Sequence, residues 1–171
     1  MNIKSVSKNY DQLIVYLSCL KHKFSVIALS ETWTCKNKQS LFPILRYNCI
    51  FKNLISSRCG GVALYVLDHI TFHECLDLNT HGNNNFECVF IQLNDVRFGK
   101  KIVGLVYYPP DSNLELISKG FDYVLKSSLK TKVDYIIAGD YNIDHLKHTA
   151  HEGTSSFVNN LYTHSGHYST H

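Results

Sequence analysis

Apolar residues recur along the chain in two spacings, one typical of helices and one typical of strands. Spacings of three and four residues, as at Leu13, Leu17 and Leu20, predict an amphipathic helix over residues 8–21, with Ser7 as a candidate cap. The same spacing predicts helices over residues 114–125 and 155–164. Short apolar runs bounded by turn residues predict strands over residues 24–29, 47–51, 61–67, 71–76, 86–93, 101–108 and 135–138.

The order of these predicted elements indicates an α/β protein. Between residues 47 and 108 the strands follow one another across short turns without a helix, which favours antiparallel meanders. The runs at 24–29 and 135–138 are almost wholly apolar, so we expect both strands to be buried, the first in a central position. Two mixed sheets packed face to face, with helices outside, satisfy this order within a single domain spanning residues 1–171.

Composition narrows the class of protein further. The chain has 171 residues, 44% hydrophobic and 18% charged, as expected of a folded domain, and its net charge of +3 is too small to identify a nucleic-acid binder. It lacks an apolar run of membrane-spanning length and an N-terminal apolar region, so we expect an intracellular protein with reduced cysteines and no membrane partner. No cysteine pair has C-x-x-C spacing. We interpret the late histidines as a polar surface loop rather than a metal site: His145, His148, His151, His164, His167 and His171.

Polar residues that could carry chemistry stand at the ends of three predicted strands. Glu31 follows the strand at 24–29, where a carboxylate suits a hard metal ion. Asp140 and Asn142 follow the strand at 135–138, and their spacing of two places both side chains on one side of an extended chain. Tyr107 ends a strand that Pro109 closes, and its phenol could donate a hydrogen bond to a phosphate oxygen. Singly, these residues also fit a solvated glutamate, an Asx turn and a strand-terminating aromatic residue.

Several motifs, taken together and in this order, carry a more specific signal. The chain resembles the endonuclease/exonuclease/phosphatase superfamily, and within it most of all the endonuclease domain of non-LTR (LINE-type) retrotransposons. The motifs that carry the resemblance run through nearly the whole chain: Asn2-Ile3-Lys4-Ser5, Ile27-Ala28-Leu29-Ser30-Glu31-Thr32-Trp33, Arg58-Cys59-Gly60-Gly61-Val62-Ala63-Leu64-Tyr65, Tyr107-Tyr108-Pro109-Pro110 and Gly139-Asp140-Tyr141-Asn142.

The resemblance implies a fold and a set of roles. The fold is a four-layer α/β sandwich of two mixed sheets flanked by helices. The activity is the metal-dependent cutting of DNA by an activated water, with Mg²⁺ as the ion and Mn²⁺ as the alternative. By this resemblance, Glu31 corresponds to the family's metal-ligand glutamate, and Asn2 corresponds to the asparagine that organises the metal site. Tyr107 falls on the phosphate-contacting tyrosine, Asp140 on the aspartate that aligns or deprotonates the water, and Asn142 on its neighbouring asparagine.

The same resemblance extends to partners and location. It implies a reverse-transcriptase domain in the same full-length polyprotein, DNA as the partner, and a nuclear location. Arg58 in the glycine turn is a further candidate for substrate contact. The sequence indicates no oligomeric state.

The chain departs from the family at its C-terminal end. A complete domain continues to a Ser-Asp-His tripeptide, whose aspartate orients the catalytic histidine. Here only His69 and His145 follow an aspartate, and both stand in the wrong place for that role, so we expect a domain truncated before its last strands. Two alternatives remain open. One is an inactive remnant that at most binds nucleic acid through basic residues, and the other is a small-molecule or lipid phosphatase of the same fold. The basic residues are Lys36, Lys38, Arg46, Lys52 and Arg58.

Overall fold

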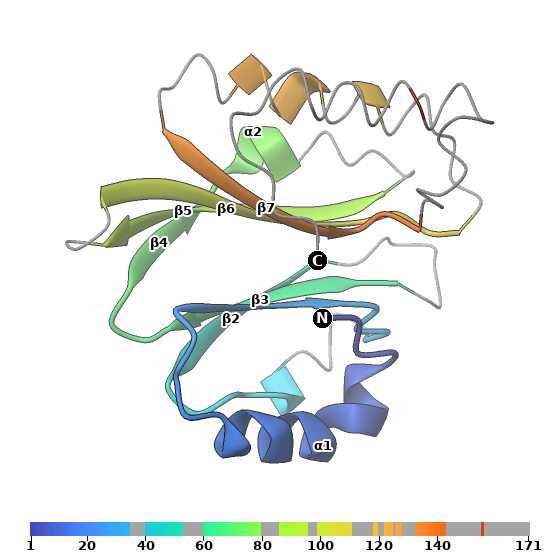
Figure 1. Cartoon of the computed structure of the whole chain (residues 1–171), viewed down its shortest axis with the longest axis vertical. Helices are drawn as coiled ribbons and strands as arrows, with labels where there is room; N and C mark the ends of the chain where they lie inside the picture. The colour runs from blue at the N-terminus through green and yellow to red at the C-terminus, as the bar shows by residue number, and fades with distance from the viewer. Residues whose placement is uncertain are drawn as a thin grey trace.

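A computed structural model shows two β-sheets stacked face to face with helical segments on both outer faces (Figure 1). Helix α1 covers the outer face of one sheet, and α2 with the helical residues near 118–127 covers the other. The predicted four-layer α/β sandwich is therefore confirmed. The structure describes residues 1–34, 40–52, 60–79, 86–95, 99–110, 118–119, 122–124, 126–127, 133–142 and 155.

Among the described residues, the first sheet contains three antiparallel strands in the order β1-β3-β2. These strands are β1 (Val26–Ser30), β2 (Tyr47–Lys52) and β3 (Val62–Leu67). Every residue of β3 is buried because β3 has a strand on each side and a layer on each face. The prediction that residues 24–29 form a central strand was wrong. β1 borders the sheet among the described strands, where Asn2 adds only an isolated parallel bridge to Ser30.

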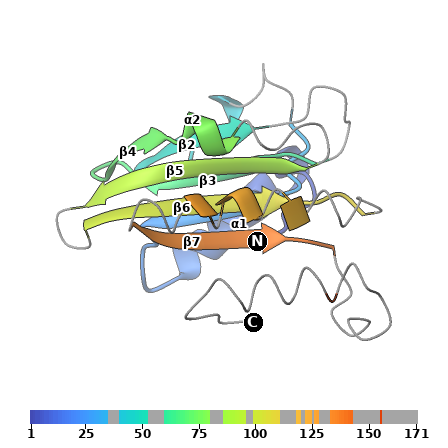
Figure 2. The ribbon, with the colours of Figure 1, turned by 90° about the horizontal axis from the view of Figure 1, so that it is seen from above.

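In the described part of the chain, the second sheet contains four strands in the order β4-β5-β6-β7. The strands β4 (Thr71–Glu74), β5 (Glu87–Asp95) and β6 (Gly99–Tyr107) form the predicted antiparallel meander, whereas β7 (Asp134–Asp140) lies parallel to β6. Figure 2 shows β7 along one edge of this sheet. The prediction that residues 135–138 are buried was wrong: β7 pairs only with β6 among the described strands, and Ile136 is 55% exposed.

The helices differ from their predicted bounds at their ends. α1 spans Val6–Cys19 and begins next to Ser5, which makes no side-chain capping bond. Ser7 therefore lies inside the helix, and the prediction that it caps α1 was wrong. The predicted strand 71–76 ends at Glu74, and the chain then forms the short helix α2 (Leu76–Asn79). Residues 118–119 and 122–124 are helical as predicted, and residues 126–127, beyond the predicted end at residue 125, are helical too. The predicted helix 155–164 lies outside the described residues except for Ser155.

Alternation along the strands separates the core into layers. Val62, Leu64 and Val66 of β3 face the second sheet, whereas Ala63 and Tyr65 face α1. In the layer between the sheets, the β3 residues pack against apolar residues of β5 and β6, namely Val89, Ile91, Leu93, Val103 and Leu105. No helix within the described ranges has the length and apolarity needed to cross a bilayer. The free thiols of Cys19, Cys49, Cys75 and Cys88 agree with the expectation of reduced cysteines, and the other two cysteines lie outside the described residues.

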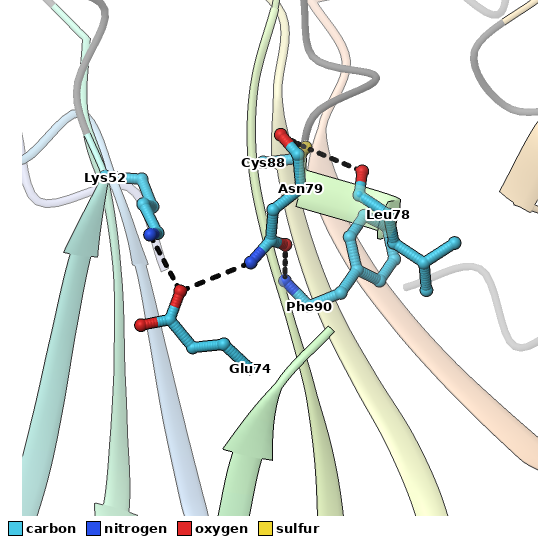
Figure 3. Close-up of polar contacts among 6 residues, drawn as sticks. All are labelled: Lys52, Glu74, Leu78, Asn79, Cys88 and Phe90. Atoms are coloured by element: carbon cyan, nitrogen blue, oxygen red, sulfur yellow. Dashed lines mark hydrogen bonds and ion pairs between the residues drawn. The ribbon is translucent and has the colours of Figure 1, made fainter. Parts of the chain in front are cut away.

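A polar cluster ties the sheets together at one side of the sandwich (Figure 3). Lys52 at the end of β2 pairs with Glu74 of β4 at 2.7 Å. The amide of Asn79 donates a hydrogen bond of 3.4 Å to Glu74 and accepts one of 2.6 Å from the backbone N–H of Phe90. The cluster thus connects the first sheet, α2 and β5 through side chains rather than through the apolar core.

The second sheet depends on a glycine beneath an aromatic ring. Gly104 of β6 stands opposite Phe90 of β5, and a Cβ at Gly104 would lie 2.2 Å from the Phe90 ring. We predict that Gly104→Ala lowers the free energy of unfolding by about 1–3 kcal/mol, because the ring or the backbone must shift. Urea unfolding followed by far-ultraviolet circular dichroism measures the change. Lys100→Ala on the same strand is exposed and serves as the control, and an unchanged midpoint for Gly104→Ala would contradict the packing described here.

Candidate active site

Three strands and the N-terminal segment converge at one end of the sandwich. The carboxyl ends of β1, β6 and β7 lie there, and β6 and β7 end side by side with Tyr107 opposite Asp140. The N-terminal segment runs along β1, because Ile3 N–H donates to Ser30 O at 3.0 Å and Ser30 N–H donates to Met1 O at 3.0 Å. Asn2 is thereby held beside the end of β1.

The amide of Asn2 contacts two acidic side chains. Its Nδ2 lies 2.6 Å from Oε1 of Glu31 and 2.9 Å from Oδ2 of Asp140. The backbone N–H of Lys4 donates to Asn2 Oδ1 at 3.1 Å, which turns the amide nitrogen toward the acids. Glu31 follows β1 in the first sheet and Asp140 ends β7 in the second, so one amide joins carboxylates of both sheets. Residues 2, 31 and 140, distant in sequence, are thus brought together as the motifs predicted.

The N-terminal segment that carries Asn2 is anchored by the first turn of α1. The side-chain amide of Asn9 donates to Ile3 O at 2.7 Å and to Lys4 O at 3.0 Å. Lys4 and Ser5 take positive φ angles of 46° and 86°, an uncommon conformation for residues with a side chain. Asn9 therefore stabilises a tight bend between the N-terminal segment and α1, and this bend sets the position of Asn2.

An open pocket of about 480 Å³ lies beside the Asn2 amide. It is lined by Met1, Asn2, Ser30, Leu105, Ala138, Gly139, Asp140, Tyr141 and Asn142. Its walls therefore come from the N-terminal segment with the end of β1 on one side, and from β6 with the end of β7 on the other. Two of the predicted site residues, Asp140 at the end of β7 and Asn142 just after it, face this one space.

Asn142 reaches the pocket in a different way from the one predicted. It takes a positive φ of 47°, so the extended chain assumed from its spacing to Asp140 ends before it. Its Nδ2 donates to Tyr108 O at 2.7 Å, and Tyr108 N–H donates to Asp140 O at 3.0 Å. These two bonds continue the pairing of β6 and β7 beyond the sheet and fix the backbone that carries Asp140.

Tyr107 and Arg58 are not part of the described pocket wall. Tyr107 is 4% exposed and packs in the core between the sheets, beside Asp140 in the β6–β7 register. Arg58 lies outside the described residues, as do Lys36, Lys38 and the late histidines. Of the basic residues considered for phosphate contact, Arg46 forms an ion pair of 3.5 Å with Asp68, and Lys52 pairs with Glu74.

Several residues that support the site were missed at the sequence level. Glu87, at the start of β5, is 4% exposed and accepts a hydrogen bond from Gly61 N–H. A single carboxylate inside the apolar run of residues 86–91 is the signal that could have identified it. Tyr108 is fully buried and stacks between Phe86 and Tyr141, with ring centroids 4.7 Å and 5.9 Å away, and burial raises the pKa of its phenol. This stack packs the segment after β7 against the second sheet.

The donor set suits a hard cation. Glu31 and Asp140 present carboxylate oxygens within about 6 Å of each other, because each has an oxygen on the same amide nitrogen, and like charges that close repel. Mg²⁺ binds through one or two carboxylates and retains several waters. Within the described ranges no group of three or more His, Cys, Asp or Glu side chains gathers, so this part of the chain has no closed zinc-type cage. Glu31 and Asp140 are the residues that could hold such an ion.

Comparison with known proteins identifies the fold. No family model and no curated protein matches the sequence, but solved structures do match the fold. The catalytic domain of APE2 from Xenopus laevis aligns with a TM-score of 0.63 at 15% identity, covering 94% of this chain and 65% of that one. The 3′ phosphatase NExo from Neisseria, bound to a product DNA hairpin, aligns with a TM-score of 0.58 at 13% identity, covering 95% of this chain and 68% of that one.

A third match carries the family name itself. An endonuclease/exonuclease/phosphatase family protein from Bacteroides thetaiotaomicron aligns with a TM-score of 0.56 at 13% identity, covering 90% of this chain and 58% of that one. The chain thus spans about two thirds or less of the length of these proteins. Its two facing sheets, with polar residues gathered at one end, have the fold of the endonuclease/exonuclease/phosphatase proteins.

Proposed function

We propose that this chain is the larger part of a metal-dependent phosphodiesterase domain that nicks DNA. The observation that carries the proposal is the Asn2 amide, which joins Glu31 and Asp140 beside an open pocket. A solved structure of the same fold, the Neisseria phosphatase, contains a product DNA. The motif order supports the more specific proposal of a LINE-type retrotransposon endonuclease, in a polyprotein that also contains a reverse transcriptase.

The charges of the site fit hydrolysis of a phosphodiester. Attack by water adds negative charge to the phosphate oxygens, and a divalent ion at Glu31 would stabilise that charge when bound. Glu31 would hold the ion, and Asn2 keeps the Glu31 carboxylate oriented through its 2.6 Å contact. Asp140 lines the pocket and can accept a proton from a water that attacks there, the role of a general base.

Two further residues hold Asp140 in place in this proposal. Asn142 fixes the backbone of Tyr108, which in turn contacts the carbonyl of Asp140. Tyr107 flanks Asp140 from the neighbouring strand, in the buried layer between the sheets. We therefore assign Tyr107 a supporting role at Asp140. A direct contact with phosphate is better placed at the pocket wall formed by Gly139 and Asn142.

A second candidate function is that of an inactive domain. Such a domain would at most bind nucleic acid, without cutting it. The two candidates differ in one observable, the metal-dependent cutting of a phosphodiester bond. A phosphatase of the same fold would differ in substrate, releasing inorganic phosphate from a monoester.

We predict that Asp140→Asn lowers the rate of plasmid nicking by about 10²- to 10⁴-fold, the usual contribution of a general base. Conversion of supercoiled plasmid to open circles with Mg²⁺, and with chelator as the blank, measures the rate. Asp134→Asn at the other end of the same strand is the matched control, because Asp134 is 77% exposed and pairs with Lys101 at 2.6 Å, away from the pocket. Equal nicking by wild type, Asp140→Asn and the chelated sample would rule out the enzymatic proposal.

We predict that Glu31→Gln weakens binding of Mn²⁺ or Mg²⁺ by about tenfold or more, because losing one unit charge near the ion costs about 1–4 kcal/mol. Trp33 is the only tryptophan, is 38% exposed and lies two residues from Glu31, so its emission reports binding directly. Asp11→Asn, exposed on α1, controls for a general change of surface charge. Identical titration curves for wild type and Glu31→Gln would place the ion elsewhere.

A further inference from the structure

Glu87 is a buried carboxylate that connects the two sheets at the end where the site lies. It is the first residue of β5 in the second sheet and is only 4% exposed. Its Oε2 accepts a hydrogen bond from the backbone N–H of Gly61, which precedes β3 in the first sheet. In the β5–β6 register it stands opposite Tyr107, the neighbour of Asp140. The carboxylate is therefore in contact with the loop that adjoins Glu31 rather than with the pocket.

The glycine turn is shaped to admit this carboxylate. A Cβ at Gly60 would lie 2.9 Å from Oε2 and 3.1 Å from Oε1 of Glu87; the first distance is shorter than real Cβ contacts, and the second is a tight contact. Gly60 and Gly61 also take φ angles of 105° and 91°, which side chains disfavour. The two glycines thus allow the backbone N–H of Gly61 to approach the buried carboxylate of Glu87.

The same peptide unit contacts the segment that follows Glu31. The N–H of Gly61 and the carbonyl of Gly60 belong to one planar peptide, so fixing the first also fixes the second. Gly60 O accepts a hydrogen bond of 2.7 Å from Trp33 N–H, and Gly61 O accepts one of 3.1 Å from Thr32 N–H. A continuous chain of hydrogen bonds therefore runs from the Glu87 carboxylate to the backbone directly after Glu31.

That backbone is strained and needs to be held. Glu31 and Trp33 take positive φ angles of 54° and 48°, which persist in residues with side chains only where the surroundings impose them. On the other side, Glu31 O accepts from Ser5 N–H at 2.8 Å and Thr32 O from Val6 N–H at 2.8 Å. The segment is thus clamped between the N-terminal bend and the glycine turn, and Glu87 is the side chain that holds the turn.

We infer that Glu87 is a positioning residue for Glu31, acting through the Gly60–Gly61 peptide. The inference rests on the proposed function for its effect on catalysis, although the clamp itself is a property of the structure. Removing the acceptor would free the turn, relax the strained segment and move the Glu31 carboxylate away from Asn2. Outer-sphere groups of this kind change metal affinity or activity by about 10- to 100-fold when they are removed.

The experiment compares Glu87→Ala with Glu87→Gln. Alanine removes the acceptor, whereas glutamine keeps a carbonyl oxygen that can accept from Gly61 N–H. We expect Glu87→Ala to weaken Mn²⁺ binding, followed by Trp33 emission, by about 10- to 100-fold, and Glu87→Gln to restore most of the affinity. Amide hydrogen exchange should accelerate at Gly61, Thr32 and Trp33 in the alanine variant and stay slow in the glutamine variant.

Glu74→Ala is the matched control. Glu74 is also a carboxylate between the two sheets, but it pairs with Lys52 away from the glycine turn (Figure 3). A loss of stability alone should therefore appear in Glu74→Ala without faster exchange at Gly61 and without loss of metal affinity. Equal metal affinity and equal Gly61 exchange in folded Glu87→Ala and wild type would overturn the inference, and so would a glutamine variant as impaired as the alanine variant.

The readouts separate this inference from the proposed function. Hydrogen exchange at Gly61, Thr32 and Trp33 needs neither metal nor DNA, so it tests the clamp even if the wild-type chain nicks no plasmid. A chain that lacks nicking activity but shows the exchange pattern would reject the enzymatic proposal and keep the role of Glu87. An active chain without the exchange pattern would keep the enzymatic proposal and reject the role of Glu87.

Discussion

The apolar contact between the two sheets is the interaction on which the site depends. Val62, Leu64 and Val66 of β3 pack against Val89, Ile91 and Leu105 of the other sheet, and stacked sheets of this kind lie about 10 Å apart. At that spacing, side chains of different sheets meet in polar contact only where strands end and loops turn inward. Asn2 reaches both Glu31 and Asp140 because it stands at such an end.

Much of the fold could be predicted from the sequence because its strands are short apolar runs between turn residues. The observed β3 and β5 lie within two residues of their predicted bounds. Of the three residues that meet at the Asn2 amide, Glu31 and Asp140 were expected from their positions at strand ends, and Asn2 from the family resemblance. Position within a sheet was harder to predict. The run at 26–30 is as apolar as a central strand, yet β1 owes its burial to α1 and the N-terminal segment rather than to strands on both sides.

The roles of the supporting residues could not be predicted, because these roles arise from tertiary contacts. Nothing in the local sequence of Glu87 indicates that Gly61, distant along the chain, will donate to it. The positive φ of Glu31 follows from hydrogen bonds on both sides of the segment, and that of Asn142 accompanies its bond to Tyr108. Such conformations contradict local preference, and conflicts of this kind concentrate at functional sites, where the rest of the structure imposes them.

The arrangement of the site lowers the stability of the folded chain. It places two acidic side chains on one neutral amide and holds non-glycine residues in left-handed conformations, and each of these features costs free energy in the folded state. The apolar layer between the sheets and the hydrogen bonds from Glu87 and Asn9 offset that cost without neutralising the charge. A small divalent cation between the acids would neutralise it directly. In the proposed function a bound ion and a few polar side chains contact the substrate, so a net charge of only +3 is compatible with action on a phosphodiester.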